Sequence, residues 1–203
     1  MSSKYQNILS ELDSSLKINK AYSKEPNWLI SIKGGGGTVL TTSSDNLQTT
    51  RTSEHELANF APIYDHQFSL TRGFAPESSS YAIMPDGGLT AHELKIVAPL
   101  SAIPSSVQEH FAQNVLLESI HLIRVITLAA ASSSEANYHV TAEYMFTHAY
   151  IAGIVSNNDV ICLAFRYAAI NYTHNAFDPL TAEAKGKSAA AYHNLVTGAA
   201  TPA

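Results

Sequence analysis

The second half of the chain is almost without charge, and this feature restricts its possible folds more than any other. Only eight residues between positions 105 and 182 carry a formal charge. A helix with one face in water normally has a charged or polar stripe opposite its apolar stripe, so a helix without that stripe is covered on both sides. We therefore expect this half of the chain to pack against other copies of itself.

The size of the chain favours one domain. Its 203 residues, 45% of them hydrophobic, are enough for one well-buried core and few for two. Charged residues make up 14% of the chain, whereas about 25% is typical of soluble domains. We predict that residues 1–203 form a single domain with a large contact surface.

The net charge of −5 excludes a general basic field, so bulk electrostatics should not attract nucleic acid to an isolated subunit. A polymer in which many subunits line a nucleic acid strand needs only one or two cations from each subunit to bind it.

The single cysteine, Cys162, lies in an apolar run and is expected to be a buried free thiol. The chain opens with an amphipathic pattern, and no run reaches the roughly 18 apolar residues of a membrane helix. We expect a cytosolic protein with no membrane partner.

The first half of the chain combines a helical pattern with a strand pattern. Apolar residues spaced by three and four predict a helix within residues 1–26, where several lysines could form a basic arm. Residues 28–32 and 38–40 are expected to be strands joined by the four glycines at 34–37. A hairpin is expected at residues 81–97, with its turn at the Pro-Asp-Gly-Gly sequence of 85–88.

The second half contains capping residues and a proline at positions typical of helix starts. Ser106 and Glu109 form a capping box that opens a helix over residues 104–131. Further helices are predicted over 134–154, with Ala142, Met145 and Ala149 on the apolar face, over 158–172, and from Asp178-Pro179 to about residue 198. Short links between helices favour an antiparallel bundle. The predicted fold is α+β, mainly α, and the expected regions are an N-terminal helix or arm (1–26), a small antiparallel β and loop region (27–103), a four-helix bundle (104–196) and a C-terminal tail (197–203).

No motif identifies a reaction. The glycines at 34–37 lack the Lys-Ser or Lys-Thr that follows in a phosphate-binding loop. Glu118 and His121 have the spacing of a helical di-iron ligand pair, but the second pair that this chemistry needs is missing. Glu135 and His139 are spaced as a surface contact of a helix. We therefore expect no catalytic residues, no metal and no cofactor.

Arg124 and Arg166 are the only cations between Lys95 and Lys185. An arginine on an otherwise apolar element needs a carboxylate or a phosphate as partner, because an unpaired buried charge is very costly. Two alternatives stay open. The partners could be internal carboxylates, or each guanidinium could contact an RNA phosphate, whose geometry it suits. The candidate internal partners are Glu118, Glu143 and Asp159.

Residues 163–172, with the sequence Leu-Ala-Phe-Arg-Tyr-Ala-Ala-Ile-Asn-Tyr, and the Ala-rich stretch 182–191 carry a family resemblance. They resemble the core of the coat proteins of flexuous filamentous plant RNA viruses, in which Arg-Tyr-Ala or Lys-Phe-Ala precedes Phe-Asp-Phe and an Ala-rich helix. The chain departs from that pattern at Ile170 and Asn171, where the family has an aspartate. Rigid rod-shaped virus coats are a second resemblance.

Both resemblances imply one function, which is assembly with other copies of the chain around single-stranded RNA in a helical capsid. They imply a virion and the host cytoplasm as the location, and Arg166 and Arg124 as the RNA-binding residues. The alternative is a homo-oligomeric structural subunit of phage or bacterial origin that binds no nucleic acid. A small-ligand or metal-dependent enzyme is a third hypothesis.

Overall fold

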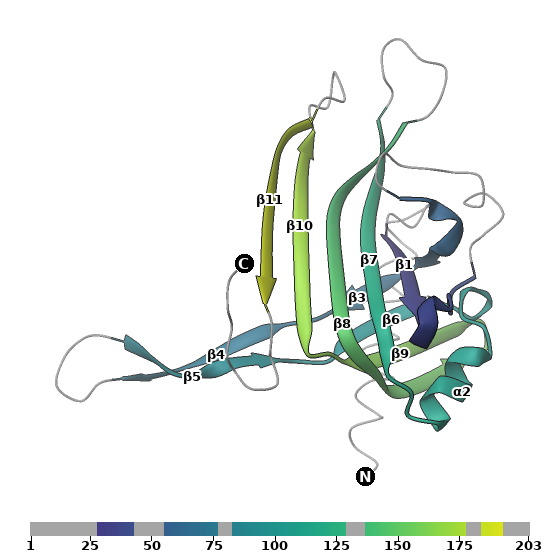
Figure 1. Cartoon of the computed structure of the whole chain (residues 1–203), viewed down its shortest axis with the longest axis horizontal. Helices are drawn as coiled ribbons and strands as arrows, with labels where there is room; N and C mark the ends of the chain where they lie inside the picture. The colour runs from purple at the N-terminus through teal and green to yellow at the C-terminus, as the bar shows by residue number, and fades with distance from the viewer. Residues whose placement is uncertain (1–27, 43–54, 77–82, 129–136, 178–183, 193–203) are drawn as a thin grey trace.

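The structure is a computed structural model that describes residues 28–42, 55–76, 83–128, 137–177 and 184–192 (Figure 1). Antiparallel strands dominate it, and its described part holds one α-helix, of seven residues. The predicted mainly α fold with a four-helix bundle is therefore wrong. The elements in chain order are β1 (Trp28–Lys33), η1 (Gly35–Gly37), η3 (Leu57–Asn59), β2 (Ala61–Ile63), β3 (Asp65–Gln67), β4 (Leu70–Pro76), β5 (Ile83–Ala91), β6 (Leu94–Pro99), η4 (Leu100–Ala102), α2 (Ser106–Ala112), β7 (Leu117–Leu128), β8 (Asn137–Asn157), β9 (Val160–Arg166), β10 (Ala169–Phe177) and β11 (Ala184–Tyr192).

Strand β8 belongs to two sheets because it bends. Its first part pairs with β7 and β10, whereas its last part, from Tyr150, pairs with β9. His148, two residues before the change of partner, has a left-handed backbone conformation, with φ of 52°, which interrupts the strand geometry. Strands β9 and β10 follow the same bend, since only Tyr167 and Ala168 separate them.

The strands close into a ring at a second corner. Strand β2 pairs with β1 and β3 pairs with β6, while Tyr64 between them donates its backbone N–H to the carbonyl oxygen of Val97 at 2.8 Å. The strand order β2-β1-β7-β8-β9-β6-β3 thus begins and ends in one short segment. Strands β10 and β11 extend one sheet beyond this ring (Figure 1).

The main core lies inside the ring. Ile30 of β1 lies opposite Leu122 of β7, and directly opposite residues of an antiparallel pair share a face. Phe146 of β8 and Phe165 of β9 complete the core, and both side chains are fully buried. Cys162 is buried, as expected.

A second apolar cluster covers the outer face of β7 and explains why a helix was expected there. Ile123 and Val125 pack against Leu29, Leu57 and Phe60 on that outer face. A strand buried on both faces loses the alternation of apolar and polar residues by which a strand is recognised in sequence. The scarcity of charge in this region therefore reflects, at least at β7, two covered faces within one chain.

The helix predicted to begin near Ser106 is present but short, and the predicted capping box does not form, since Ser105 is the N-cap residue and makes no side-chain cap hydrogen bond. It ends at Ala112 instead of continuing to residue 131, because Asn114 has a φ of 51° and the chain then enters β7. The predicted helix over 134–154 is β8, and the one over 158–172 lies in β9 and β10. Of the fourth predicted helix, residues 184–192 form β11.

The first half of the chain agrees in part with its predicted strands. Residues 28–32 form β1 as expected, but the return strand at 38–40 is reduced to one isolated bridge between Lys33 and Val39. The turn expected at 85–88 lies inside β5, which continues to Ala91 and pairs with β4. The predicted helix or arm at 1–26 and the tail at 197–203 lie outside the described residues.

In the described ranges, no helix combines the length and the apolar character needed to cross a membrane.

Candidate functional site

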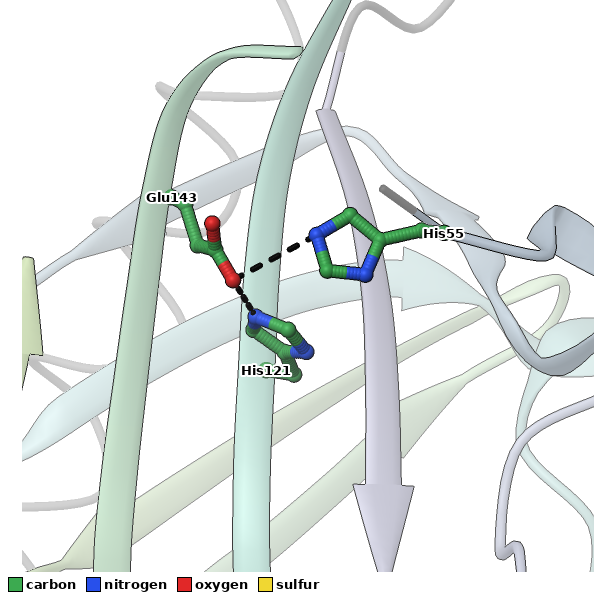
Figure 2. A group of neighbouring side chains, drawn as sticks. All are labelled: His55, His121 and Glu143. Atoms are coloured by element: carbon green, nitrogen blue, oxygen red, sulfur yellow. Dashed lines mark hydrogen bonds and ion pairs between the residues drawn. The ribbon is translucent and has the colours of Figure 1, made fainter. Parts of the chain in front are cut away.

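Three polar side chains meet on the outer face of the sheet, from three separate segments. His121 lies on β7 between the core residues Ile120 and Leu122, so the pleat directs its side chain away from the core. Glu143 lies on the neighbouring strand β8, opposite Ile123. His55 precedes η3, which crosses this face. Figure 2 shows the three side chains pointing toward one another.

One carboxylate oxygen joins the three residues. Oε1 of Glu143 lies 2.5 Å from Nε2 of His121 and 3.4 Å from Nε2 of His55. The two imidazole rings are nearly perpendicular, with centroids 5.0 Å apart, and the ring of Phe60 contacts both. All three side chains are largely buried, with exposed fractions of 15% to 18%. We call these three residues the His-His-Glu cluster.

The cluster holds Glu143 in its ionised form. The hydrogen bond with His121, followed by the nearby imidazole of His55, holds the pKa of the Glu143 carboxyl well below its ordinary value, although burial acts in the opposite direction. Ser31 of β1 lies directly opposite His121 on the next strand. Its side chain is buried, and its Oγ has no hydrogen-bond partner among the described residues.

The sequence pattern indicates His121 as a possible ligand, but its carboxylate partner is Glu143 and not Glu118. Glu118 would share a helix face with His121, but residues three apart on a strand point to opposite faces. Glu118 is exposed, and Glu143 of the adjacent strand lies beside His121 instead. No spacing in the sequence links His55 to the other two residues. His55 reaches them only because the segment that contains His55 and η3 lies across the sheet beside β7 and β8.

The two arginines predicted to bind RNA lie outside this cluster and are not brought together, since Arg124 lies opposite Ala142 of β8 and Arg166 opposite Tyr150 of the same strand. Arg124 is exposed on β7, where its backbone carbonyl accepts a hydrogen bond from Thr141. Arg166 ends β9, its side chain is 72% exposed, and its Nε donates to Oε1 of Glu93 at 3.3 Å. Glu93 was not among the carboxylates considered as partners. An RNA contact of Arg166 or Arg124 stays a prediction.

Two features of the surface are suited to contact with another chain. The β4–β5 hairpin is a separate two-stranded sheet, and in Figure 1 it extends away from the body on the side opposite α2. Near α2, large apolar side chains are exposed, among them Phe111 (43%), Leu116 (42%) and Tyr150 (40%).

The fold of the chain resembles that of several solved structures. No family model matches the chain, and no curated protein matches it in sequence. A type six secretion system protein matches with a TM-score of 0.60 at 12% identity, over 84% of this chain and 98% of that chain. An Hcp protein matches with a TM-score of 0.55 at 11% identity, over 82% and 96%. The Hcp1 protein from E. coli EAEC 042 matches with a TM-score of 0.53 at 10% identity, over 73% and 91%.

These matches overturn the resemblance to plant virus coat proteins. Residues 163–172, which carried that resemblance, lie in β9 and β10 and not in a helix. The interpretation as an RNA-packaging helical capsid protein is therefore wrong, and so is the expected location in a virion or the host cytoplasm. The chain shares the fold of Hcp proteins.

Proposed function

We propose that the chain is a structural subunit that assembles with copies of itself, in a role related to that of type VI secretion proteins. The fold it shares with a type six secretion system protein and with Hcp proteins supports this function. It corresponds to the alternative drawn from the sequence, a homo-oligomeric structural subunit of phage or bacterial origin. The proposal includes no catalytic step.

The observation that carries the proposal is the β4–β5 hairpin. Its strands of seven and nine residues pair with each other and with no other described strand. An isolated two-stranded hairpin is at best marginally stable in water. Its outer edges also present unpaired backbone N–H and C=O groups, which are templates for pairing with another chain. Contact with a neighbouring copy would satisfy those groups and stabilise the hairpin.

The exposed apolar side chains near α2 supply a second contact surface. Leu116 and Tyr150 adjoin the paired residues Leu117 and Ala149, so they occupy neighbouring positions in the β7–β8 register. The hairpin leaves the body on the opposite side (Figure 1). A contact between two such different surfaces is heterologous, and repeated heterologous contacts produce a closed ring or an open filament.

Light scattering coupled to gel filtration tests this function. The wild-type chain is expected to elute as a defined oligomer. A Phe111→Glu or Leu116→Glu variant should stay folded, since both side chains are exposed, but should associate at least about tenfold more weakly, because burying such a side chain contributes about 1.5 to 3 kcal/mol.

Gln113→Glu is the matched control, since Gln113 is an exposed residue at the C-terminus of the same helix. It adds the same charge without removing apolar surface and should assemble normally. A wild-type chain that is monomeric at every concentration would refute the proposed function. Equal assembly of all four proteins would refute the role of the surface near α2.

A further inference from the structure

We propose that the His-His-Glu cluster is a zinc-binding site, with Nε2 of His55, Nε2 of His121 and a carboxylate oxygen of Glu143 as ligands. Its ligands come from β7, β8 and the segment before η3, and none of them belongs to the β4–β5 hairpin or to α2. Its ligand atoms all lie within 4.8 Å of one another, and it is the group of this kind found in the described part of the chain.

The donor set is one that zinc uses. Two imidazole nitrogens and one carboxylate oxygen are found in zinc sites with three protein ligands and a fourth position open to water. Magnesium and calcium prefer oxygen ligands only, so they do not suit this set. The cluster therefore has the chemistry of a transition-metal site.

The geometry of the cluster is close to what a zinc ion requires. Tetrahedral bonds of 2.0 to 2.1 Å place neighbouring ligand atoms about 3.3 Å apart. The 3.4 Å between Nε2 of His55 and Oε1 of Glu143 already matches that spacing. Nε2 of His121 lies closer to the same oxygen, at 2.5 Å, which is shorter than an ordinary N–H···O hydrogen bond. Replacing that proton with zinc requires these two atoms to separate by less than about 1 Å, and the two imidazole nitrogens already lie within 4.8 Å of each other; side-chain rotation supplies movements of this size.

The surroundings hold the ligands in place. His121 and Glu143 lie on adjacent paired strands, and Phe60 packs against both imidazole rings. The buried Oγ of Ser31 lies opposite His121 and has no partner among the described residues. A zinc-bound histidine usually donates its second ring N–H to an oxygen, which fixes the ring. The Oγ of Ser31 can accept that hydrogen bond from His121, so zinc binding would provide a partner for a hydroxyl that has none among the described residues.

Bound zinc would link the segment at His55 to strands β7 and β8, which are distant from it in the sequence. The ion binds the folded chain, in which the three ligands meet, so it stabilises that state. At a zinc concentration one hundred times the dissociation constant, Tm should rise by about 5 to 10 °C for a chain of this size.

The test uses the full-length chain, freed of metal with EDTA and then titrated with ZnCl2 in a calorimeter. Wild type is expected to bind one zinc ion per chain, and Co²⁺ in its place should give the strong visible absorption of a tetrahedral site. His55→Gln and Glu143→Gln each remove one ligand while keeping a polar side chain of similar size. They should weaken zinc binding at least about tenfold, so that at the same zinc concentration the rise in Tm falls to about half of the wild-type value or less.

His92→Gln is the matched control, because His92 is exposed between β5 and β6 and contacts Thr71 rather than the cluster. It should bind zinc as wild type does. Circular dichroism establishes that each variant is folded before titration. Absence of zinc binding by wild type would overturn the proposal, as would equal binding by wild type, His55→Gln and Glu143→Gln.

Discussion

Replacing Phe146 tests the strand register at the centre of the molecule. Its side chain is fully buried, and its ring lies 5.3 Å from that of Phe68 and 4.7 Å from that of Tyr167. Removing such a ring loses its transfer free energy and leaves a cavity, so Phe146→Ala should lower the free energy of unfolding by about 3 to 5 kcal/mol. That is a large share of the roughly 5 to 15 kcal/mol by which proteins are stable.

The adjacent residue is the matched comparison. Met145 points to the outer face and is partly exposed, so Met145→Ala should cost about 1 kcal/mol. In the helix expected from the sequence, Met145 would instead be the core residue. Urea unfolding followed by the fluorescence of the single tryptophan, Trp28, measures both variants. A cost for Met145→Ala equal to or above that for Phe146→Ala would refute the strand register.

Three further predictions concern ionisable side chains. Burial raises the pKa of Tyr167 to about 12, and its hydroxyl has no hydrogen-bond partner among the described residues. Tyr167→Phe should therefore leave Tm unchanged or higher, and a loss of more than about 1 kcal/mol in the free energy of unfolding would contradict this. In EDTA at neutral pH, Glu143→Gln should cost about 1.5 to 3 kcal/mol in urea unfolding. The folded-state pKa of Glu143 lies below its ordinary 4.5, so the stability that its ionised carboxylate contributes is present above pH 4.5 and is lost as the pH falls through the folded-state pKa. The free energies of unfolding of wild type and Glu143→Gln should therefore converge in acid. A difference that stays constant with pH would argue against the ionised carboxylate. Arg166→Ala should change the free energy of unfolding by less than about 1 kcal/mol, since its pair with Glu93 is exposed, and thermal melts showing a larger loss would contradict that assignment.

The sequence predicted local structure correctly at the strand of residues 28–32, which the glycines at 34–37 follow, and at the start of the helix near Ser106. It failed where tertiary packing covers both faces of a strand. In β9, every residue from Ile161 to Phe165 is buried, so its sequence has no period of two that could separate it from a buried helix.

The candidate site could not be predicted from the sequence because it depends on long-range register. His121 and Glu143 are brought together by the β7–β8 pairing, and His55 by a segment that crosses the sheet. The spacing of Glu118 and His121 gave a false pair, since it is meaningful only on a helix. A single sequence contains no local signal for the bend at His148, and this bend divides β8 between two sheets.

Native mass spectrometry of the full-length chain tests self-assembly, the central claim of the proposed function, most directly. We expect one dominant species whose mass is a whole-number multiple of the 21.9 kDa subunit and whose stoichiometry does not change with concentration, as a closed ring requires. A single species at 21.9 kDa, persisting as the protein is concentrated, would contradict it.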